Sequence, residues 1–204
     1  MGKRMLGGLL LVVCLLGLGG CVFGSVDEMY ALPKSSEAYV NLQAKINEEK
    51  GTGEYIAPLN GENRQTIQLV DVDEDGIQEA VAFFRDADAD TPLRIVIFKQ
   101  DDQGEYQVYA RIQGVGSEID SIEYVNLGGA GESDVLVSWQ AGSSLRTLVG
   151  YTITDGQPTE IMRSAYDRYL TADLDGDGQE EVVLAQAEEE SSSTRIEYYD
   201  SRDG

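Results

Sequence analysis

The sequence predicts an all-β protein made of about three antiparallel, propeller-like blades, with one short helix near the N-terminus. From Pro58 onward, apolar and polar residues alternate with a period of two in short runs separated by polar turns, which is typical of antiparallel strands. The strand pattern also recurs about every 50 residues, and this spacing is typical of propeller blades of about four strands. A helical period precedes these runs, in residues 36–50.

The N-terminal segment has the features of an export signal. Residues 5–18 are almost wholly apolar and follow Lys3 and Arg4; they are too few to cross a bilayer, which takes ~20 residues. A Leu lies three residues before Cys21 and a Gly directly before it. This combination resembles a bacterial lipoprotein signal peptide. The resemblance implies that residues 1–20 are removed and that Cys21 carries diacylglycerol; a signal cut elsewhere and an apolar N-terminal anchor are the alternatives.

The next two segments are a tether and a helix. We expect residues 21–35 to be the lipidated cysteine and its tether, and residues 36–51 to form a helix with its terminating glycine. Ser36 can cap the N-terminus and Gly51 suits the C-terminal stop. The apolar residues of this segment fall near one face: Tyr39, Leu42 and Ile46.

Residues 52–204 form the predicted β-repeats. The runs that alternate like strands are residues 66–70, 80–85, 93–99, 106–112, 121–125, 134–140, 145–153, 160–163, 169–172, 182–185 and 195–199. Residues 68–81, 123–136 and 170–183 can be aligned, because each holds an apolar strand, an acidic or glycine-rich loop and a second apolar strand.

The third copy is shorter than the first two. Later turns in the three copies end at Gly104, Gly156 and Gly204, and only the first two copies continue into an outer strand. A propeller needs about four to eight blades to close. We therefore expect an incomplete propeller, truncated at the C-terminus; the alternative is a short open stack whose last edge is covered by the helix of residues 36–50.

Two of the aligned loops carry the same acidic motif, D-x-D-x-D-G-x-x-E. Calcium takes six to eight oxygen ligands, and alternate carboxylates on a tight loop can supply them from one side. The seventh residue of each loop would add a backbone carbonyl, and the ninth would complete the shell from the start of the next strand. The predicted ligands are Asp71, Asp73, Asp75, Ile77 and Glu79 in the first loop, and Asp173, Asp175, Asp177, Gln179 and Glu181 in the third.

An EF-hand has its last acid at position 12 and helices on both sides. Here the last acid is at position 9 and the flanks are strands. The motif thus resembles the calcium loop of FG-GAP/VCBS repeats, as in the propeller of integrin α chains, although the FG and GAP words themselves are missing. The resemblance covers about residues 65–204 and implies two structural Ca²⁺ sites on propeller blades.

Other acidic segments are weaker candidates. A solvated acidic turn is the plain alternative for any single loop, but two matching copies favour calcium. The middle loop keeps only Asn126 at position 1 and Asp134 at position 9, so we expect no metal there. Residues 86–90 alternate carboxylates but lack the glycine and have Arg94 at position 9, which favours a hairpin loop.

Composition narrows the function. The formal charge is −22, and −24 once Lys3 and Arg4 are removed, which disfavours nucleic acid as a partner. The chain has no histidine, and its two cysteines are Cys14, which leaves with the signal, and Cys21, so no disulfide is expected and the commonest general base is missing. Several aromatic residues could stack on sugars, namely Tyr55, Tyr109, Tyr124, Trp139, Tyr151, Tyr198 and Tyr199. Core or inter-blade packing is the more common role for such residues in strands.

We therefore expect a non-catalytic, calcium-stabilised propeller module, anchored by the Cys21 lipid on the extracytoplasmic face of a bacterial membrane and binding a protein or glycan partner. The alternative is a lipid-anchored hydrolase or carbohydrate-active enzyme whose active site lies on blades missing from this chain.

Overall fold

The computed structural model describes residues 37–73, 75–114, 116–128, 134–142, 145–188 and 193–200. The predicted signal, the tether, Cys21 and the turn ending at Gly204 lie outside the described residues, so these expectations remain predictions. Within the described ranges, no helix is both long enough and apolar enough to cross a membrane.

Helix α3 (Glu37–Lys50) agrees with the predicted helix. Leu42 and Ile46 are buried, whereas Tyr39 is half exposed, so the buried face is narrower than predicted. The helix ends as expected: Gly51 has a φ of 53° and donates its amide hydrogen to the Asn47 carbonyl at 3.2 Å, which is a left-handed C-terminal stop.

Twelve strands follow in the described part of the chain, and eleven of them match the predicted runs to within three residues at each end. The unpredicted strand, β1, has two exposed residues that carry no alternation. The strands are β1 (Glu54–Tyr55), β2 (Ile67–Val70), β3 (Glu79–Arg85), β4 (Leu93–Gln100), β5 (Tyr106–Gly114), β6 (Glu118–Val125), β7 (Asp134–Ala141), β8 (Leu145–Thr154), β9 (Gln157–Ala165), β10 (Arg168–Ala172), β11 (Glu181–Glu188) and β12 (Ser193–Tyr199).

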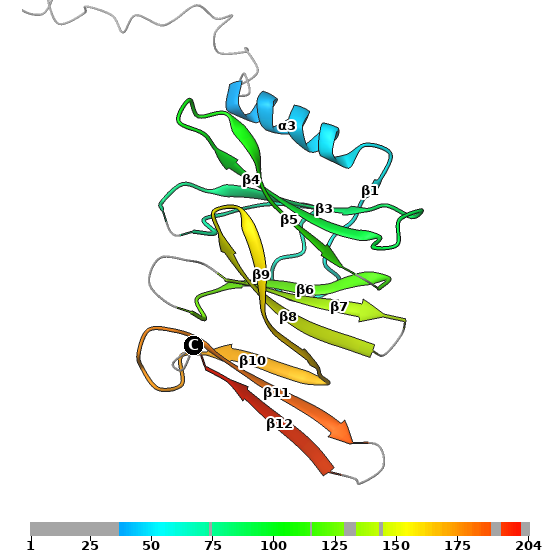
Figure 1. The fold of residues 1–204 in the computed structure, drawn as a ribbon, viewed down its shortest axis with the longest axis vertical. Coiled ribbons are helices and arrows are strands. Elements are labelled where there is room, and N and C mark those ends of the chain that lie inside the picture. The colour runs from blue at the N-terminus through cyan, green and yellow to red at the C-terminus, as the bar shows by residue number, and fades with distance from the viewer. Residues whose placement is uncertain are drawn as a thin grey trace, which may run out of the picture. The chain divides into compact units, whose positions relative to one another are not determined.

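The strands form three antiparallel sheets (Figure 1). The first sheet is the meander β2-β3-β4-β5, with β1 pairing β3 on the same side as β2. The second sheet is the meander β6-β7-β8-β9, and the third is β10-β11-β12. None of these sheets, as far as they are described, closes into a barrel. The prediction of an all-β, antiparallel protein with one helix is therefore confirmed at this level.

The helix and the sheets are layered on one another through three apolar clusters. Leu42 and Ile46 of α3 pack on one face of the first sheet, and the opposite face packs on the second sheet. A third cluster joins the second sheet to the third. Strand β3 shows the period of two that produces these layers, because Val81 and Phe83 face the second sheet while its even-numbered residues face the helix.

This layering corrects one of the sequence-based alternatives. An open stack with the helix over its last edge is wrong in its placement, because α3 covers the first sheet. On the far side of the third sheet, Leu170, Ile196 and Tyr198 are at least half exposed. That face is therefore apolar and open to solvent in the described residues.

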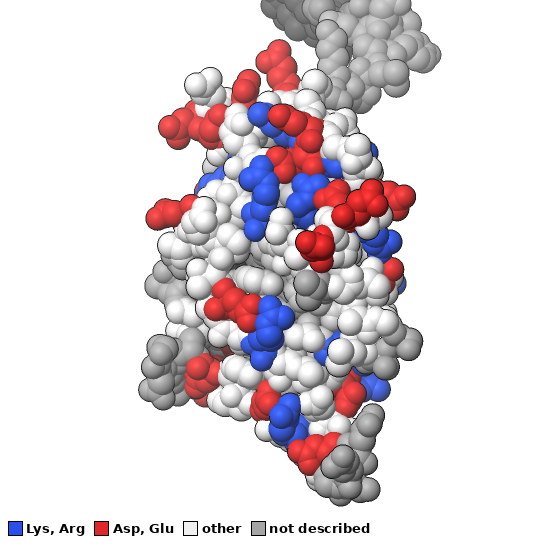
Figure 2. Space-filling model, turned by 45° about the vertical axis from the view of Figure 1, so that its right-hand side comes forward, with Lys and Arg blue, Asp and Glu red and all other residues white. Residues whose placement is uncertain are grey.

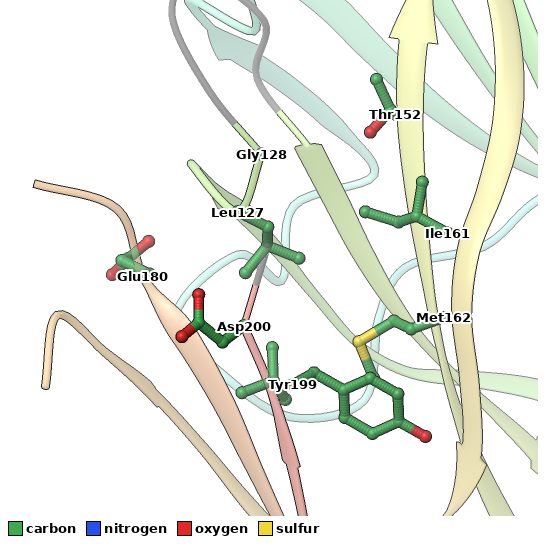
Figure 3. A pocket seen from close by; sticks show the side chains of 9 residues that line it. Leu127, Gly128, Thr152, Ile161, Met162, Glu180, Tyr199 and Asp200 are labelled. Carbon is green, nitrogen blue, oxygen red and sulfur yellow. The ribbon is translucent and has the colours of Figure 1, made fainter. Parts of the chain in front are cut away.

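A cavity of about 330 Å³ opens between the second and third sheets. Ile161 and Met162 of β9 project into it, opposite Leu127 and the ring of Tyr199 (Figure 3). The cavity continues the apolar cluster that joins these two sheets.

The hairpins also follow the sequence. Gly104 and Gly156 have φ values of 78° and 75° and lie in the turns that follow β4 and β8, where a left-handed residue favours glycine. Residues 86–92 link β3 to β4 as a hairpin loop. The predicted hairpin loop is confirmed, because β3 and β4 pair antiparallel on either side of it; the Asp86 carboxylate pairs with Arg94 at 3.0 Å.

Candidate metal centres

Each of the three aligned loops joins two consecutive, antiparallel strands of one sheet. The first loop connects β2 to β3, the middle loop β6 to β7, and the third loop β10 to β11. The ninth-position acid is the first residue of the second strand in every case: Glu79, Asp134 and Glu181. The sequence-based placement of this acid at the start of a strand is confirmed.

The first and third loops share the conformation of the glycine at position 6. Position 6 is Gly76 or Gly178, with φ values of 86° and 91°, and its amide hydrogen is donated to the position-1 carboxylate, Asp71 or Asp173, at 2.9 and 3.1 Å. The left-handed φ explains why glycine is required there.

The fifth and seventh positions repeat in the same way. The amides of Ile77 and Gln179 donate to the carboxylates of Asp75 and Asp177 at 2.8 and 2.9 Å. Whether the carbonyls of Ile77 and Gln179 ligate a metal stays a prediction. These hydrogen bonds therefore recur in two segments about 100 residues apart. The loops differ at the other oxygen of position 1, because Asp71 Oδ1 accepts from the Asp75 amide and Asp173 Oδ1 from the Gly176 amide.

A further hydrogen bond is common to all three loops. The amide of position 2 donates to one oxygen of the ninth-position acid: 2.7 Å from Val72 to Glu79 Oε2, 2.9 Å from Leu127 to Asp134 Oδ2, and 2.6 Å from Leu174 to Glu181 Oε2. We call this bond the loop latch. Because the middle loop has it without the central carboxylates, the latch belongs to the turn and does not depend on the acidic motif.

The first loop contains two buried oxygens without a hydrogen-bond partner. Oxygens of Asp71, Asp73 and Glu79 lie within 4.8 Å of one another, and Glu79 is 1% exposed. The latch uses Glu79 Oε2, whereas the buried atoms Glu79 Oε1 and Asp73 Oδ1 have no hydrogen-bond partner. Burial raises the pKa of Glu79, and the charges of Asp73 and Asp75 raise it further. A buried acceptor without a partner costs about 1–3 kcal/mol, and a cation among these oxygens would remove that cost.

Lys99, at the end of β4, enters the same loop. Its Nζ pairs with Asp73 Oδ2 and lies 2.9 Å from Asp75 Oδ2. The ammonium also sits 5.7 Å from the centre of the Tyr109 ring, within cation–π range. Although burial opposes it, hydrogen bonding to Asp73 and Asp75 raises the pKa of Lys99, and the bond from Lys99 lowers the pKa of Asp75.

The third loop brings all four of its predicted acids together. Oxygens of Asp173, Asp175, Asp177 and Glu181 lie within 4.8 Å of one another; the three aspartates are exposed and Glu181 is buried. Four carboxylates at this separation repel one another. Hard oxygen donors gathered at one point are the ligands that calcium prefers, so both loops fit that ion, the third with one more acid than the first.

The middle loop is arranged differently. Asp134 Oδ2 accepts the latch from Leu127, and Asp134 Oδ1 accepts a hydrogen bond from the Thr152 hydroxyl. Both oxygens of this buried acid are therefore used within the protein. Residues 129–133 lie outside the described residues.

The aromatic side chains considered for sugar stacking divide into two groups. Trp139 and Tyr151 are buried in the cluster between the first and second sheets, and Tyr109 and Tyr124 pack against it. Tyr198 is 53% exposed on the third sheet. Core packing therefore accounts for most of them.

The acidic excess is spread over the surface. Figure 2 shows red acidic side chains over one face with blue Lys and Arg side chains among them. Charged groups also pair across elements: Glu49 of α3 contacts Arg94 of β4 at 3.5 Å and Arg111 of β5 at 2.6 Å.

Comparison with protein-family models, with curated proteins and with solved structures yields no match.

Two residues at the loops were missed by sequence reasoning, namely Lys99 and Thr152. Each lies on the strand that follows the one beginning with the ninth-position acid, and opposite that acid. Asp134 pairs with Thr152, and continuing the register from Ala80 and Phe98 by one residue brings Glu79 opposite Lys99. The only sequence signal for Lys99 is a lysine at the end of an apolar run. This signal points to the loop only once the register of β3 and β4 is known.

Proposed function

We propose that this chain is a calcium-stabilised, propeller-type repeat module of the FG-GAP/VCBS kind, tethered outside the cytoplasmic membrane, which binds a protein or glycan partner without catalysing a reaction. The observation that carries the calcium proposal is the first loop, where Glu79 Oε1 is buried without a partner beside the carboxylates of Asp71 and Asp73.

Calcium would be held by the acids of each loop. Asp71, Asp73, Asp75 and Glu79 would ligate one ion, and Asp173, Asp175, Asp177 and Glu181 the other. Each ion would join the loop to the first residue of the second strand, and so stabilise the turn that starts the sheet. With ~1 mM calcium and a ~0.1 mM dissociation constant, each site adds about 1.4 kcal/mol to the free energy of unfolding.

The proposed location rests on the N-terminal sequence. A lipid on Cys21 would tether the sheets in an extracytoplasmic compartment, where millimolar calcium can fill sites of modest affinity. Two such sites would provide part of the stability that disulfides provide in other exported domains.

A binding role is favoured over catalysis by the residue types available. The chain has no histidine, and the clustered acids of the first and third loops already fit a structural cation. The formal charge of −22 favours partners that are neutral or basic, and it disfavours nucleic acid.

Thermal unfolding tests the calcium proposal. The melting temperature of the full chain is expected to rise when EGTA is replaced by 1 mM calcium, and the double variant Asp73→Ala/Asp175→Ala should lose this rise. An unchanged melting temperature in the wild type would refute calcium binding. Asp102→Ala, an exposed acid in the turn after β4, is a control that should retain the full rise.

Metabolic labelling tests the anchor. Cells given an alkyne analogue of palmitate should label the wild-type protein and leave Cys21→Ala unlabelled. Equal label on the two proteins would remove the lipid from the proposal without affecting the calcium sites.

A further inference from the structure

The first loop differs from the third in the residue that approaches it from the neighbouring strand. In the first sheet this residue is Lys99, opposite Glu79 when the register of β3 and β4 is continued by one residue. In the third sheet, the register of Val182 and Tyr199 continued by one residue brings Asp200 opposite Glu181. A cation and an anion therefore stand at equivalent positions of two loops with the same motif.

The contacts of Lys99 coincide with an incomplete gathering of acids. Asp71, Asp73 and Glu79 come together in the first loop, and Asp75 is not among them; its Oδ2 lies 2.9 Å from Lys99 Nζ. In the third loop the equivalent residue, Asp177, lies with the other three acids. Of the two carboxylates that Lys99 contacts, Asp73 belongs to the first cluster and Asp75 is the acid that the cluster lacks.

The lysine is held in place from two sides. Its side chain is 28% exposed, its Nζ contacts Asp73 as well as Asp75, and the Tyr109 ring of β5 lies beneath it. These contacts restrict the conformations of the Lys99 side chain in the folded protein. Its ammonium therefore stays close to the two carboxylates.

We propose that Lys99 is a built-in competitor for calcium in the first loop. The ammonium neutralises Asp73 and Asp75 when no metal is bound, and calcium must displace it from both carboxylates to complete its shell. This inference rests on the proposed function, because it concerns the regulation of a calcium site. Its consequence is that the first loop stays ordered at low calcium and is filled only at higher calcium.

The competition has a simple electrostatic basis. A carboxylate oxygen that accepts from an ammonium is less available to a hard cation, and a positive charge next to the site repels the incoming ion. Removing the ammonium should therefore strengthen calcium binding and, without calcium, weaken the loop, since the aspartates then repel one another without compensation.

Calcium titration calorimetry tests this in a background where only the first loop can bind. In the full chain carrying Asp173→Asn and Asp175→Asn, adding Lys99→Met is expected to tighten calcium binding about fivefold to tenfold, the range expected for two partly exposed ion pairs. The melting temperature of the same variant in EGTA should fall. Lys45→Met, which removes one positive charge from α3, is the matched control and should change calcium affinity less than twofold.

The possible outcomes separate the two proposals. Unchanged or weaker calcium binding in the Lys99→Met protein refutes the competition, and so does a first loop that binds no calcium with or without Lys99. Neither result affects the proposed function if the complementary protein, Asp71→Asn/Asp73→Asn, still binds one calcium through the third loop. If neither loop binds calcium in the wild type, the proposed function itself fails.

Discussion

The first and third loops carry the same nine-residue acidic motif on the same turn, yet they differ electrostatically. Three hydrogen bonds recur in both loops with lengths that agree to within about 0.2 Å: the latch, the bond from the glycine at position 6 and the bond from position 7. The other acceptor oxygen of position 1 is used differently, because Asp71 Oδ1 accepts from the Asp75 amide and Asp173 Oδ1 from the Gly176 amide. In the first loop Lys99 occupies two of the acids; in the third, all four acids gather. The comparison teaches that the motif fixes the backbone, while a residue on the neighbouring strand adjusts the charge.

The largest expected effect distinguishes the stability contributed by the loop latch from that contributed by bound calcium. Asp134→Ala in the middle loop should lower the free energy of unfolding by about 2 kcal/mol, equally in EGTA and in calcium, because it leaves the buried Leu127 amide and the Thr152 hydroxyl without their acceptor. Urea unfolding in the two buffers measures this.

Glu79→Ala provides the contrast with Asp134→Ala. In EGTA its cost should be smaller, since the lost latch is partly offset by removal of a buried carboxylate that faces two other acids. In 1 mM calcium the cost should grow by the binding energy of the lost site, about 1.4 kcal/mol. A calcium-independent cost for Glu79→Ala would remove Glu79 from the metal site.

The next effect compares how strongly the two acidic loops bind calcium. At 0.1 mM calcium, Asp175→Asn should remove more of the calcium-induced rise in melting temperature than Asp73→Asn does, because the third loop brings four acids together and the first only three. Equal losses would mean that Lys99 does not weaken the first site. Asn keeps the shape of Asp, so the change in charge is isolated.

The ion pairs of Glu49 with Arg94 and Arg111 do not involve the acidic loops. Their contribution to stability can therefore be compared with that of the calcium sites. The hydrogen bond from Arg111, with the charges of Arg111 and Arg94, holds the pKa of Glu49 below its ordinary 4.5. The stability from Glu49 is therefore fully present above pH 4.5 and is lost as pH falls through the lower folded-state pKa. Glu49→Gln should cost about 1 kcal/mol at pH 7, and this cost should shrink as the pH falls below 4.5.

Thermal melts from pH 7 to pH 2 in EGTA measure the Glu49 effect, and Glu48→Gln on the exposed side of the same helix is the control. A cost for Glu49→Gln that does not shrink in acid would contradict the ion-pair origin of its stability.

The smallest expected effect tests the left-handed glycine at position 6, which the first and third loops share. Gly76→Ala and Gly178→Ala should each cost about 1 kcal/mol, because both glycines have a left-handed φ that alanine adopts with strain. An added Cβ would meet nothing within 4 Å at either position, so the cost should be equal in the two loops. Unequal costs by urea unfolding would show that the loop backbones differ.

Much of the fold follows from the sequence because strands on a layered sheet need a strict period of two. Strand β3 is recognisable without a structure as a short apolar run between polar turns, but its division into Val81 and Phe83 on one layer and Ala82 on the other is not, because both faces of the strand are buried. Strand β1 was not visible, since its two exposed residues carry no pattern. The position of α3 over the first sheet was also missed, because an amphipathic helix shows which face is buried but not the surface that buries it.

The candidate site likewise has a part that the sequence predicts and a part that it does not. The ligand types and their spacing are local, so the sequence predicts them, as it does the glycine at position 6. Lys99 lies 20 residues beyond Glu79 and reaches the loop through the register of β3 and β4, which depends on tertiary packing. The orphaned Glu79 Oε1 likewise arises from burial, and no residue pattern reveals it.

The most direct test of the central claim is a calorimetric calcium titration of the full wild-type chain beside Asp173→Asn/Asp175→Asn. We predict two calcium ions per wild-type chain with unequal affinities, and loss of the tighter one in the variant. No binding to the wild type, or two sites of equal affinity, would contradict the account.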